Sequence, residues 1–278
     1  MLTLSPQLKA QTEGRPLMQK ARSDIEQFYL SGEYLRKNPS LHVEDSSWKA
    51  DVIAPFVDRF ALIHNGSPLK VLDVGGGAGV LLSMIVDRLR RTAGRPVTKC
   101  AIEFSPEMLE VQKSNNPDLE RTEQGSIETT FFGDKEFDLV LLVDVLEHLP
   151  NAETALREIR RIGRYAIIKI PLEDTVHFRL MNALRGGSLR RHAIESVGHV
   201  QSFSVATYRQ TIHSVEGTII EERFTNIFGY LLASPSHRSK MSTWQRCGNL
   251  VCSGASSVAP RLTARFFRDH VVMLVWFP

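Results

Sequence analysis

Four glycines within five positions, in residues 75–79, constrain this chain more than any other feature. They follow the apolar run 69–74, and the helical-looking stretch 80–86 comes directly after them. A strand, a glycine loop and a helix together bring a ligand against bare backbone at a helix N-terminus, where unpaired amides favour anionic groups. Glycine suits such a loop because it tolerates positive φ and has no Cβ to hold a ligand off. The pattern predicts an α/β fold with a ligand site at the C-terminal end of this strand.

Dinucleotide-binding proteins use the same device, so the glycine spacing must be compared with theirs. Their fingerprint is Gly-x-Gly-x-x-Gly, and its third glycine packs the helix against the strand. Read from Gly75 and Gly77, the third position here is Val80. Read from Gly77 and Gly79, it is Leu82. Both readings lack the third glycine, which disfavours an NAD-dependent dehydrogenase.

A second predicted strand, residues 97–103, also ends in an acid, Glu103. Ser105, Pro106 and an acidic residue then start a helix, with Ser as N-cap and Pro at the first helical position. A carboxylate at the C-terminal end of a strand can accept hydrogen bonds from both ribose hydroxyls of an adenosine. Glu103 is therefore the candidate ribose ligand, and Phe104 beside it can stack on the adenine.

Strands and helices alternate from Leu69 onward, which predicts a parallel sheet with helices on both faces. Further strands are expected at residues 119–123, from Phe137, and at 165–170. The longest apolar run, 271–277, is too short to span a bilayer, so we interpret it as a final core strand.

The order of these motifs resembles class I S-adenosylmethionine-dependent methyltransferases, especially small-molecule enzymes such as those of the ubiquinone and menaquinone pathways. In that family an Asp stands two residues before Gly-x-Gly-x-Gly, and an acid ends the second strand. The turn after the third strand contacts adenine, and the fourth strand begins with Phe-Asp and is followed by Glu-His-hydrophobic-Pro. Here Phe137-Asp138 and Glu147-His148-Leu149-Pro150 fill those places. The resemblance is close over residues 69–150 and looser beyond them.

The resemblance implies S-adenosyl-L-methionine as the cofactor and a Rossmann-like, doubly wound, seven-stranded sheet with an antiparallel last strand. Ser126 stands where the family often has Asp, so a hydroxyl or backbone contact replaces the carboxylate there. Asp144 can accept from the ammonium group of the cofactor, while Asp73 orients the loop amides or bonds the ammonium through water. The predicted cofactor-binding residues are Asp73, Gly75, Gly76, Gly77, Gly79, Glu103, Phe104, Ser126, Ile127, Asp144 and Val145.

The rest of the chain is expected to build the parts around this core. Residues 1–65 form a helical N-terminal extension that folds over the cofactor as a lid, and residues 66–278 form the methyltransferase domain. Insertions at about 172–203 and 229–262 form a cap that holds the acceptor, because binding residues sit on loops carried by a rigid scaffold. Two helices are expected in the extension, one over residues 16–30 and one carrying the stripe Trp48, Val52, Phe56 and Phe60.

The chemistry that the resemblance implies is an in-line displacement of a methyl group onto a small-molecule acceptor, with a hydroxyl oxygen favoured. His148 and His199 are the candidate catalytic bases, because imidazole takes up a proton near neutral pH. No metal-ligand constellation stands out, so the reaction is predicted to be metal-independent. The arginines between Arg179 and Arg191 either bind an acidic group of the acceptor or form a solvated basic face.

Composition narrows the alternatives without settling the acceptor. A formal charge of +3 neither requires nor excludes nucleic acid, and the fourth strand lacks the Asn/Asp-Pro-Pro-aromatic turn of base-amino methyltransferases. We therefore disfavour an RNA substrate. Three cysteines without a CxxC pair, and no secretory signal, indicate the cytoplasm. A protein methyltransferase, a cofactor-binding but inactive partner subunit, and a homodimer all stay open.

Overall fold

The computed structural model describes residues 27–38, 40–41 and 43–278. At its centre lies a seven-stranded sheet with the order β3-β2-β1-β4-β5-β7-β6. All neighbouring pairs are parallel except those of β7, which runs antiparallel to both β5 and β6. This arrangement confirms the predicted α/β sheet with an antiparallel last strand. The strands are β1 (Leu69–Val74), β2 (Val97–Glu103), β3 (Leu119–Gln124), β4 (Phe137–Val143), β5 (Gly163–Leu172), β6 (Thr218–Phe224) and β7 (Asp269–Trp276).

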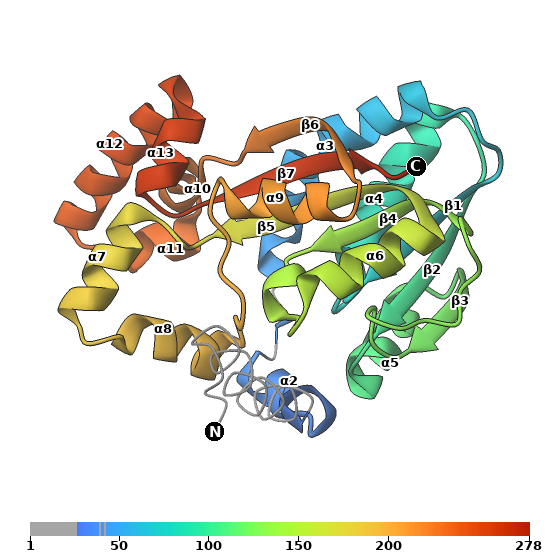
Figure 1. The fold of residues 1–278 in the computed structure, drawn as a ribbon, viewed down its shortest axis with the longest axis horizontal. Helices are drawn as coiled ribbons and strands as arrows, with labels where there is room; N and C mark the ends of the chain where they lie inside the picture. The colour runs from blue at the N-terminus through green and yellow to red at the C-terminus, as the bar shows by residue number, and fades with distance from the viewer. Residues whose placement is uncertain (1–26, 39, 42) are drawn as a thin grey trace, which may run out of the picture.

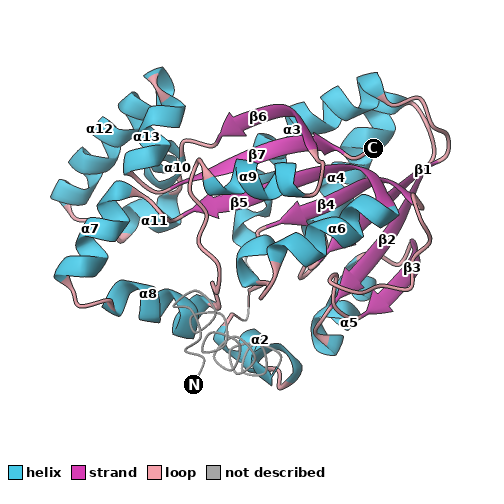
Figure 2. Cartoon of the chain, in the orientation of Figure 1, coloured by secondary structure: helices cyan, strands magenta, loops and turns pink. Residues whose placement is uncertain are grey.

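Helices cover both faces of the sheet, as the alternation of elements predicts (Figures 1 and 2). On one face lie α3 (Ser46–Ile63) and α4 (Val80–Ala93), and on the other lie α6 (Ala152–Ile162) and α9 (Thr207–Ser214). α5 (Pro106–Asn115) packs beside β2 and β3. Its start follows the sequence signals, because the Ser105 side chain caps the helix by accepting from the Met108 amide.

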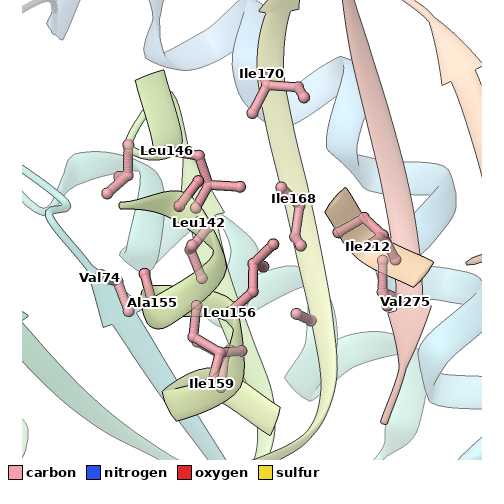
Figure 3. Close-up of a cluster of buried hydrophobic side chains, with 14 of the residues drawn as sticks. Val74, Leu142, Leu146, Ala155, Leu156, Ile159, Ile168, Ile170, Ile212 and Val275 are labelled. Atoms are coloured by element: carbon pink, nitrogen blue, oxygen red, sulfur yellow. The ribbon is translucent and has the colours of Figure 1, made fainter. Parts of the chain in front are cut away.

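The period-2 alternation of side chains divides the core into two apolar clusters, one on each face of the sheet. Along β1, Leu72 belongs to the cluster under α6 and α9, whereas Leu69 belongs to the cluster under α3 and α4. Figure 3 shows Leu156 of α6 beside Leu142 of β4 in the first cluster. Each such side chain contributes about 1.5–3 kcal/mol through burial, so the sheet is a rigid base for whatever its strand ends carry.

The remaining helices gather mainly at the end of the sheet toward which β5 and β6 point (Figure 1). The insertion after β5 carries three of them, and the segment between β6 and β7 carries four. Their bounds are α7 (Val176–Leu184), α8 (Ser188–His192), the π-helix η3 (Ala193–Val197), α10 (Ile227–Ala233), α11 (Pro235–Ser239), α12 (Thr243–Val258) and α13 (Pro260–Phe266). Among the described residues, no helix is both long and apolar enough to cross a membrane.

The N-terminal extension is described only from residue 27 onward. Most of the predicted helix 16–30 lies outside the described residues, and residues 27–30 are helical. A short helix, α2 (Glu33–Lys37), and the 3-10 turn η1 (Val43–Asp45) lead into α3. The residues of the predicted stripe on α3 have two different environments. Phe56 and Phe60 are buried in the core, whereas Trp48 lines a cavity. The division of the chain at residue 65 stays a prediction.

Candidate functional site

Two cavities lie at the C-terminal ends of β1, β2 and β4. The smaller has a volume of about 130 Å³ and the larger about 500 Å³. Gly75, Asp144 and His148 line both, so the cavities meet at these residues. Every site residue predicted from the sequence lines at least one of the two cavities. The structure thus brings together all thirteen residues, although their individual roles stay predictions.

The glycine loop folds tightly over Asp73 and borders the larger cavity. At Gly76, a Cβ would lie 1.8 Å from the Oδ2 atom of Asp73, so a side chain has no room there. Gly79 is the N-cap of α4 and has a φ of 71°, in the left-handed region that favours glycine. The loop therefore exposes bare backbone and the N-terminus of α4 to the cavity, as the glycine spacing predicts.

Three amide side chains of α5 and its C-cap hold this loop in place. Gln112 donates to Oδ2 of Asp73 at 2.9 Å. Asn115 and Asn116 donate to loop carbonyl oxygens at 2.8 and 3.0 Å. Burial, and then the nearby charge of Glu103, raise the pKa of Asp73 to about 7. Asp73 thus sits beneath the loop as a buried carboxyl bonded to Gln112, and its predicted role of orienting the loop amides stays a prediction.

Glu103 ends β2 in the wall of the smaller cavity and is only 3% exposed. Its Oε1 atom accepts from the amides of Phe104 and Ser105 at 2.8 and 3.2 Å. Its Oε2 atom is buried and has no hydrogen-bond partner among the described residues. Burial raises the pKa of this carboxyl. A buried carboxylate oxygen without a partner is costly, so Glu103 is prepared to accept a hydrogen bond from a ligand.

The turn after β3 supplies the far wall of the smaller cavity through Ser126 and Ile127. The Ser126 hydroxyl accepts from the Glu128 amide at 3.2 Å, so this hydroxyl also shapes the turn. Glu128 lines the same cavity, and its Oε1 atom accepts from the Asn151 amide at 3.2 Å. A carboxylate therefore lies in the wall of the same cavity two residues after Ser126. The signal for Glu128 was in the sequence, as an acid in the same turn.

Asp144 lies where the two cavities meet and has a φ of 58°, which is uncommon outside glycine. Lys169 approaches its Oδ1 atom to 2.5 Å, and Lys49 approaches Oδ2 to 3.0 Å. Burial raises the pKa of Asp144, but the two lysines outweigh burial and hold the pKa well below its usual range. An ammonium group of a ligand would share this carboxylate with both lysines, so the predicted ammonium contact stays a prediction.

The two candidate bases, His148 and His199, lie in contact, with ring centroids 4.8 Å apart and the rings at 79°. His148 Nδ1 lies 3.2 Å from the carbonyl oxygen of Gly198, and His199 Nδ1 lies 2.9 Å from Oε2 of Glu173. Burial, and then the charge of His199, lower the pKa of His148 to about 4. His148 is therefore neutral at neutral pH and carries its proton on Nδ1, because a carbonyl oxygen can only accept.

Sequence reasoning missed several residues that line the larger cavity. Lys49, Lys169 and Arg268 bring positive charge to its wall. Trp48 stacks on Tyr230 of α10 with ring centroids 4.3 Å apart, so the N-terminal extension and the second insertion share one aromatic wall. Lys169 carried a readable signal, since a lysine interrupts the apolar strand β5. The others come from segments distant in the sequence.

The arginines of the first insertion do not reach this cavity. In the part of the chain that the structure describes, no arginine between Arg179 and Arg191 lines either cavity. Arg179 is paired with Asp174, and Arg190 contacts Ser202 and the Val200 carbonyl oxygen. These contacts favour the second interpretation of the arginines, a solvated basic face with local partners.

Comparisons with known proteins agree with this geometry. Residues 72–165 match the methyltransferase domain family. The ubiquinone/menaquinone biosynthesis C-methyltransferase UbiE of Nitrobacter hamburgensis is 28% identical over 120 residues, covering 40% of this chain and 46% of that protein. The bifunctional methionine biosynthesis protein MetXA/MetW of Rhodopirellula baltica is 36% identical over 105 residues, covering 37% of this chain and 16% of that protein. The chain therefore spans less than half of the length of either relative.

Solved structures show the same fold at low identity. A candidate sarcosine dimethylglycine methyltransferase from Galdieria sulphuraria is 16% identical, with a TM-score of 0.58 covering 91% of this chain and 98% of that one. Geranyl diphosphate C-methyltransferase from Streptomyces coelicolor A3(2), solved with Mg²⁺, geranyl diphosphate and S-adenosyl-L-homocysteine, is 10% identical. Its TM-score is 0.55, covering 82% of this chain and 80% of that one.

The order of the motifs, the topology of the sheet and the matched domain all indicate a methyltransferase fold. The glycine loop, the strand-end acid and the Glu-His turn follow one another along residues 69–150, and the structure brings them to one edge of the sheet. Residues 72–165 thus carry a domain of the methyltransferase family, and the motifs and the sheet around that domain have the order and the fold of class I S-adenosylmethionine-dependent methyltransferases.

Proposed function

We propose that this protein transfers the methyl group of S-adenosyl-L-methionine to a small-molecule acceptor, at a hydroxyl oxygen. The observation that carries the proposal is Glu103, whose buried Oε2 atom lacks a partner among the described residues in a cavity that adjoins the glycine loop. Few ligands other than a nucleoside would use a strand-end carboxylate and a bare glycine loop together.

The residues present fit the nucleoside part of this cofactor. Glu103 offers a carboxylate oxygen to the ribose hydroxyls, and Phe104 and Ile127 offer apolar surface to the base. Glu128, in the same cavity, offers a carboxylate toward the amino group of adenine. The methionine part would lie along the glycine loop, because the loop lines the larger cavity with bare backbone and the N-terminus of α4 favours a carboxylate.

The larger cavity suits a small acceptor. Its volume of about 500 Å³ is within the usual range for small-molecule sites. When bound, the cofactor supplies a methyl group already activated on a sulfonium, so the protein mainly orients the acceptor and excludes water. Trp48 and Tyr230 would hold an apolar part of the acceptor, and the cations Lys49 and Arg268 would suit a polar or acidic part.

A hydroxyl acceptor must lose a proton as its oxygen gains the methyl group. His148 is placed to take that proton on Nε2, because its Nδ1 atom donates to the Gly198 carbonyl oxygen and the ring lines both cavities. His199 is the second candidate base, with Glu173 holding its Nδ1 atom. A cytoplasmic location and a homodimer remain predictions from the sequence.

The test is calorimetric titration of the purified chain with S-adenosylmethionine, S-adenosylhomocysteine and NAD. The two adenosyl ligands should bind with micromolar Kd and NAD should not. Glu103→Ala should weaken binding about tenfold to a hundredfold, the loss expected for hydrogen bonds to a charged group. Glu107→Ala, an exposed acid four residues away, should leave the Kd unchanged. Binding of NAD in place of the adenosyl ligands would refute the proposal.

A further inference from the structure

Three metal-ligating side chains meet where the cavities join. Glu147 and His148 lie on η2 (Leu146–His148), the 3-10 turn after β4, and His199 follows η3. One ligand atom from each residue lies within 4.8 Å of the other two. Donors about 2.1 Å from a zinc ion lie roughly 3.4 Å from one another, so small side-chain rotations would bring these three atoms to bonding distance.

Both imidazoles are held in the way that metal-ligating histidines are held. A ligating histidine usually donates its other ring N–H to a carbonyl or a carboxylate, which fixes the tautomer and the ring orientation. His148 Nδ1 contacts the carbonyl oxygen of Gly198 at 3.2 Å, and His199 Nδ1 contacts the carboxylate of Glu173 at 2.9 Å. In each ring these contacts leave Nε2 as the nitrogen with a lone pair.

Glu147 provides a second, independent observation. The residue is 1% exposed, and its Oε2 atom is buried without a hydrogen-bond partner among the described residues. Among those residues Glu147 also forms no ion pair, although Lys169 of the same cavity is engaged with Asp144 nearby. A buried carboxylate oxygen left unsatisfied is destabilising, and a bound cation would satisfy it.

We propose that Glu147, His148 and His199 bind a divalent transition-metal ion of the zinc class. Two imidazoles and one carboxylate suit Zn²⁺, Fe²⁺ or Co²⁺ better than Mg²⁺ or Ca²⁺, which prefer oxygen ligands throughout. Three protein ligands leave a further coordination position open toward the cavity, as in catalytic rather than structural zinc sites. The proposal departs from the expectation from the sequence that the reaction needs no metal. No local signal pointed to these ligands together, because His199 lies 51 residues beyond His148 and only the fold joins them.

The proposed function gives the ion a task. An acceptor hydroxyl in the open position would have a lowered pKa and would release its proton to water before it attacks the methyl group. The two histidines would then act as ligands in place of acting as bases. This assignment of the task rests on the proposed function, whereas binding of the ion itself does not.

The experiment uses the untagged full-length chain, stripped with a chelator and dialysed against metal-free buffer. Titration with Co²⁺ should give visible d–d absorption that saturates at one ion per chain, and Zn²⁺ should displace Co²⁺ with loss of the band. His199→Ala and Glu147→Gln should abolish the band or weaken binding at least about a hundredfold. Glu173→Gln, which touches only the supporting contact, should weaken binding about tenfold to a hundredfold. His213→Ala, an exposed histidine on α9, should bind as the wild type does.

Circular dichroism and S-adenosylhomocysteine titration on every variant separate loss of the ion from loss of the fold. Failure of the wild type to bind one ion, or equal binding by His199→Ala and the wild type, would overturn the metal site. A wild type that binds S-adenosylhomocysteine but takes up no ion would overturn this inference and leave the methyltransferase proposal standing. A wild type that takes up the ion but binds no adenosyl ligand would do the reverse.

Discussion

Replacing Asp73 by Asn tests the interpretation of the buried carboxyl beneath the glycine loop. Burial and the nearby Glu103 raise the pKa of Asp73 from 3.8 to about 7. At 1.36 kcal/mol per pKa unit, the ionised form costs the folded state about 4 kcal/mol relative to the unfolded chain. Asn preserves the shape and can still accept from Gln112, but it cannot ionise. We therefore expect Asp73→Asn to stabilise the ligand-free protein at alkaline pH.

The sign and the pH window follow from linkage. A carboxyl whose pKa is raised by folding contributes its full stability below its unfolded pKa, near 3.8, and this stability is lost as the pH rises through about 7. Urea unfolding at pH 5, 6, 7 and 8 should therefore show the free-energy advantage of Asp73→Asn growing by about 2.5 kcal/mol across the series. The change with pH is the readout, because any constant effect of the substitution cancels.

The matched control is Asp87→Asn on the exposed surface of α4, which should change stability by less than about 0.5 kcal/mol at every pH. Parallel pH profiles for the wild type and Asp73→Asn would refute the reasoning. So would an advantage that shrinks between pH 5 and pH 8.

Two further substitutions test the loop and the buried ion pairs. Gly76→Ala places a Cβ 1.8 Å from Asp73, about 1.2 Å closer than side-chain carbons approach an oxygen, so the loop must move. We expect at least about tenfold weaker S-adenosylhomocysteine binding by calorimetry and about 1–3 kcal/mol lower stability. Lys169→Met leaves Asp144 with one lysine in place of two, and denaturant unfolding should show a loss of about 3 kcal/mol.

Each of these substitutions has a control in the same chain. Gly248→Ala lies on α12 with open space where the Cβ would go, and it should be neutral or stabilising by up to about 1 kcal/mol. Lys113→Met removes an exposed pair with Glu110 and should cost less than about 1 kcal/mol. If the controls lose as much as the buried variants, the assigned contacts are not the cause.

The fold was largely readable from the sequence because its signals are local. The strand containing Val97 and Glu103 has the predicted bounds, and Ser105 caps the following helix as expected. Apolar runs, strand-end acids and caps each act within a few residues, so a linear sequence displays them. The wall of the larger cavity away from the glycine loop has no such local signal, because its residues come from the extension, two insertions and the start of β7.

The individual residues of the site illustrate the same division. Gly76 stands in the glycine loop and Glu103 at the end of β2, and each belongs to a local motif whose spacing is fixed by the backbone. Both residues line the predicted site. Trp48 meets Tyr230 only through folding, so the spacing of the stripe on α3 could predict a helix but not this contact. His199 stood out as a candidate, yet its contacts with His148 and Glu173 depend on the path of the whole first insertion.

The three amides that hold the glycine loop have a kinetic consequence. Asn115 and Asn116 donate to carbonyl oxygens of the loop and Gln112 donates to Asp73 beneath it, so side chains of the protein itself hold the shape of the loop. A loop ordered in advance adds little conformational entropy loss to association. The proposed cofactor could then bind before the acceptor is present. Its dissociation rate, and not closure of the loop, would set how long the protein stays loaded.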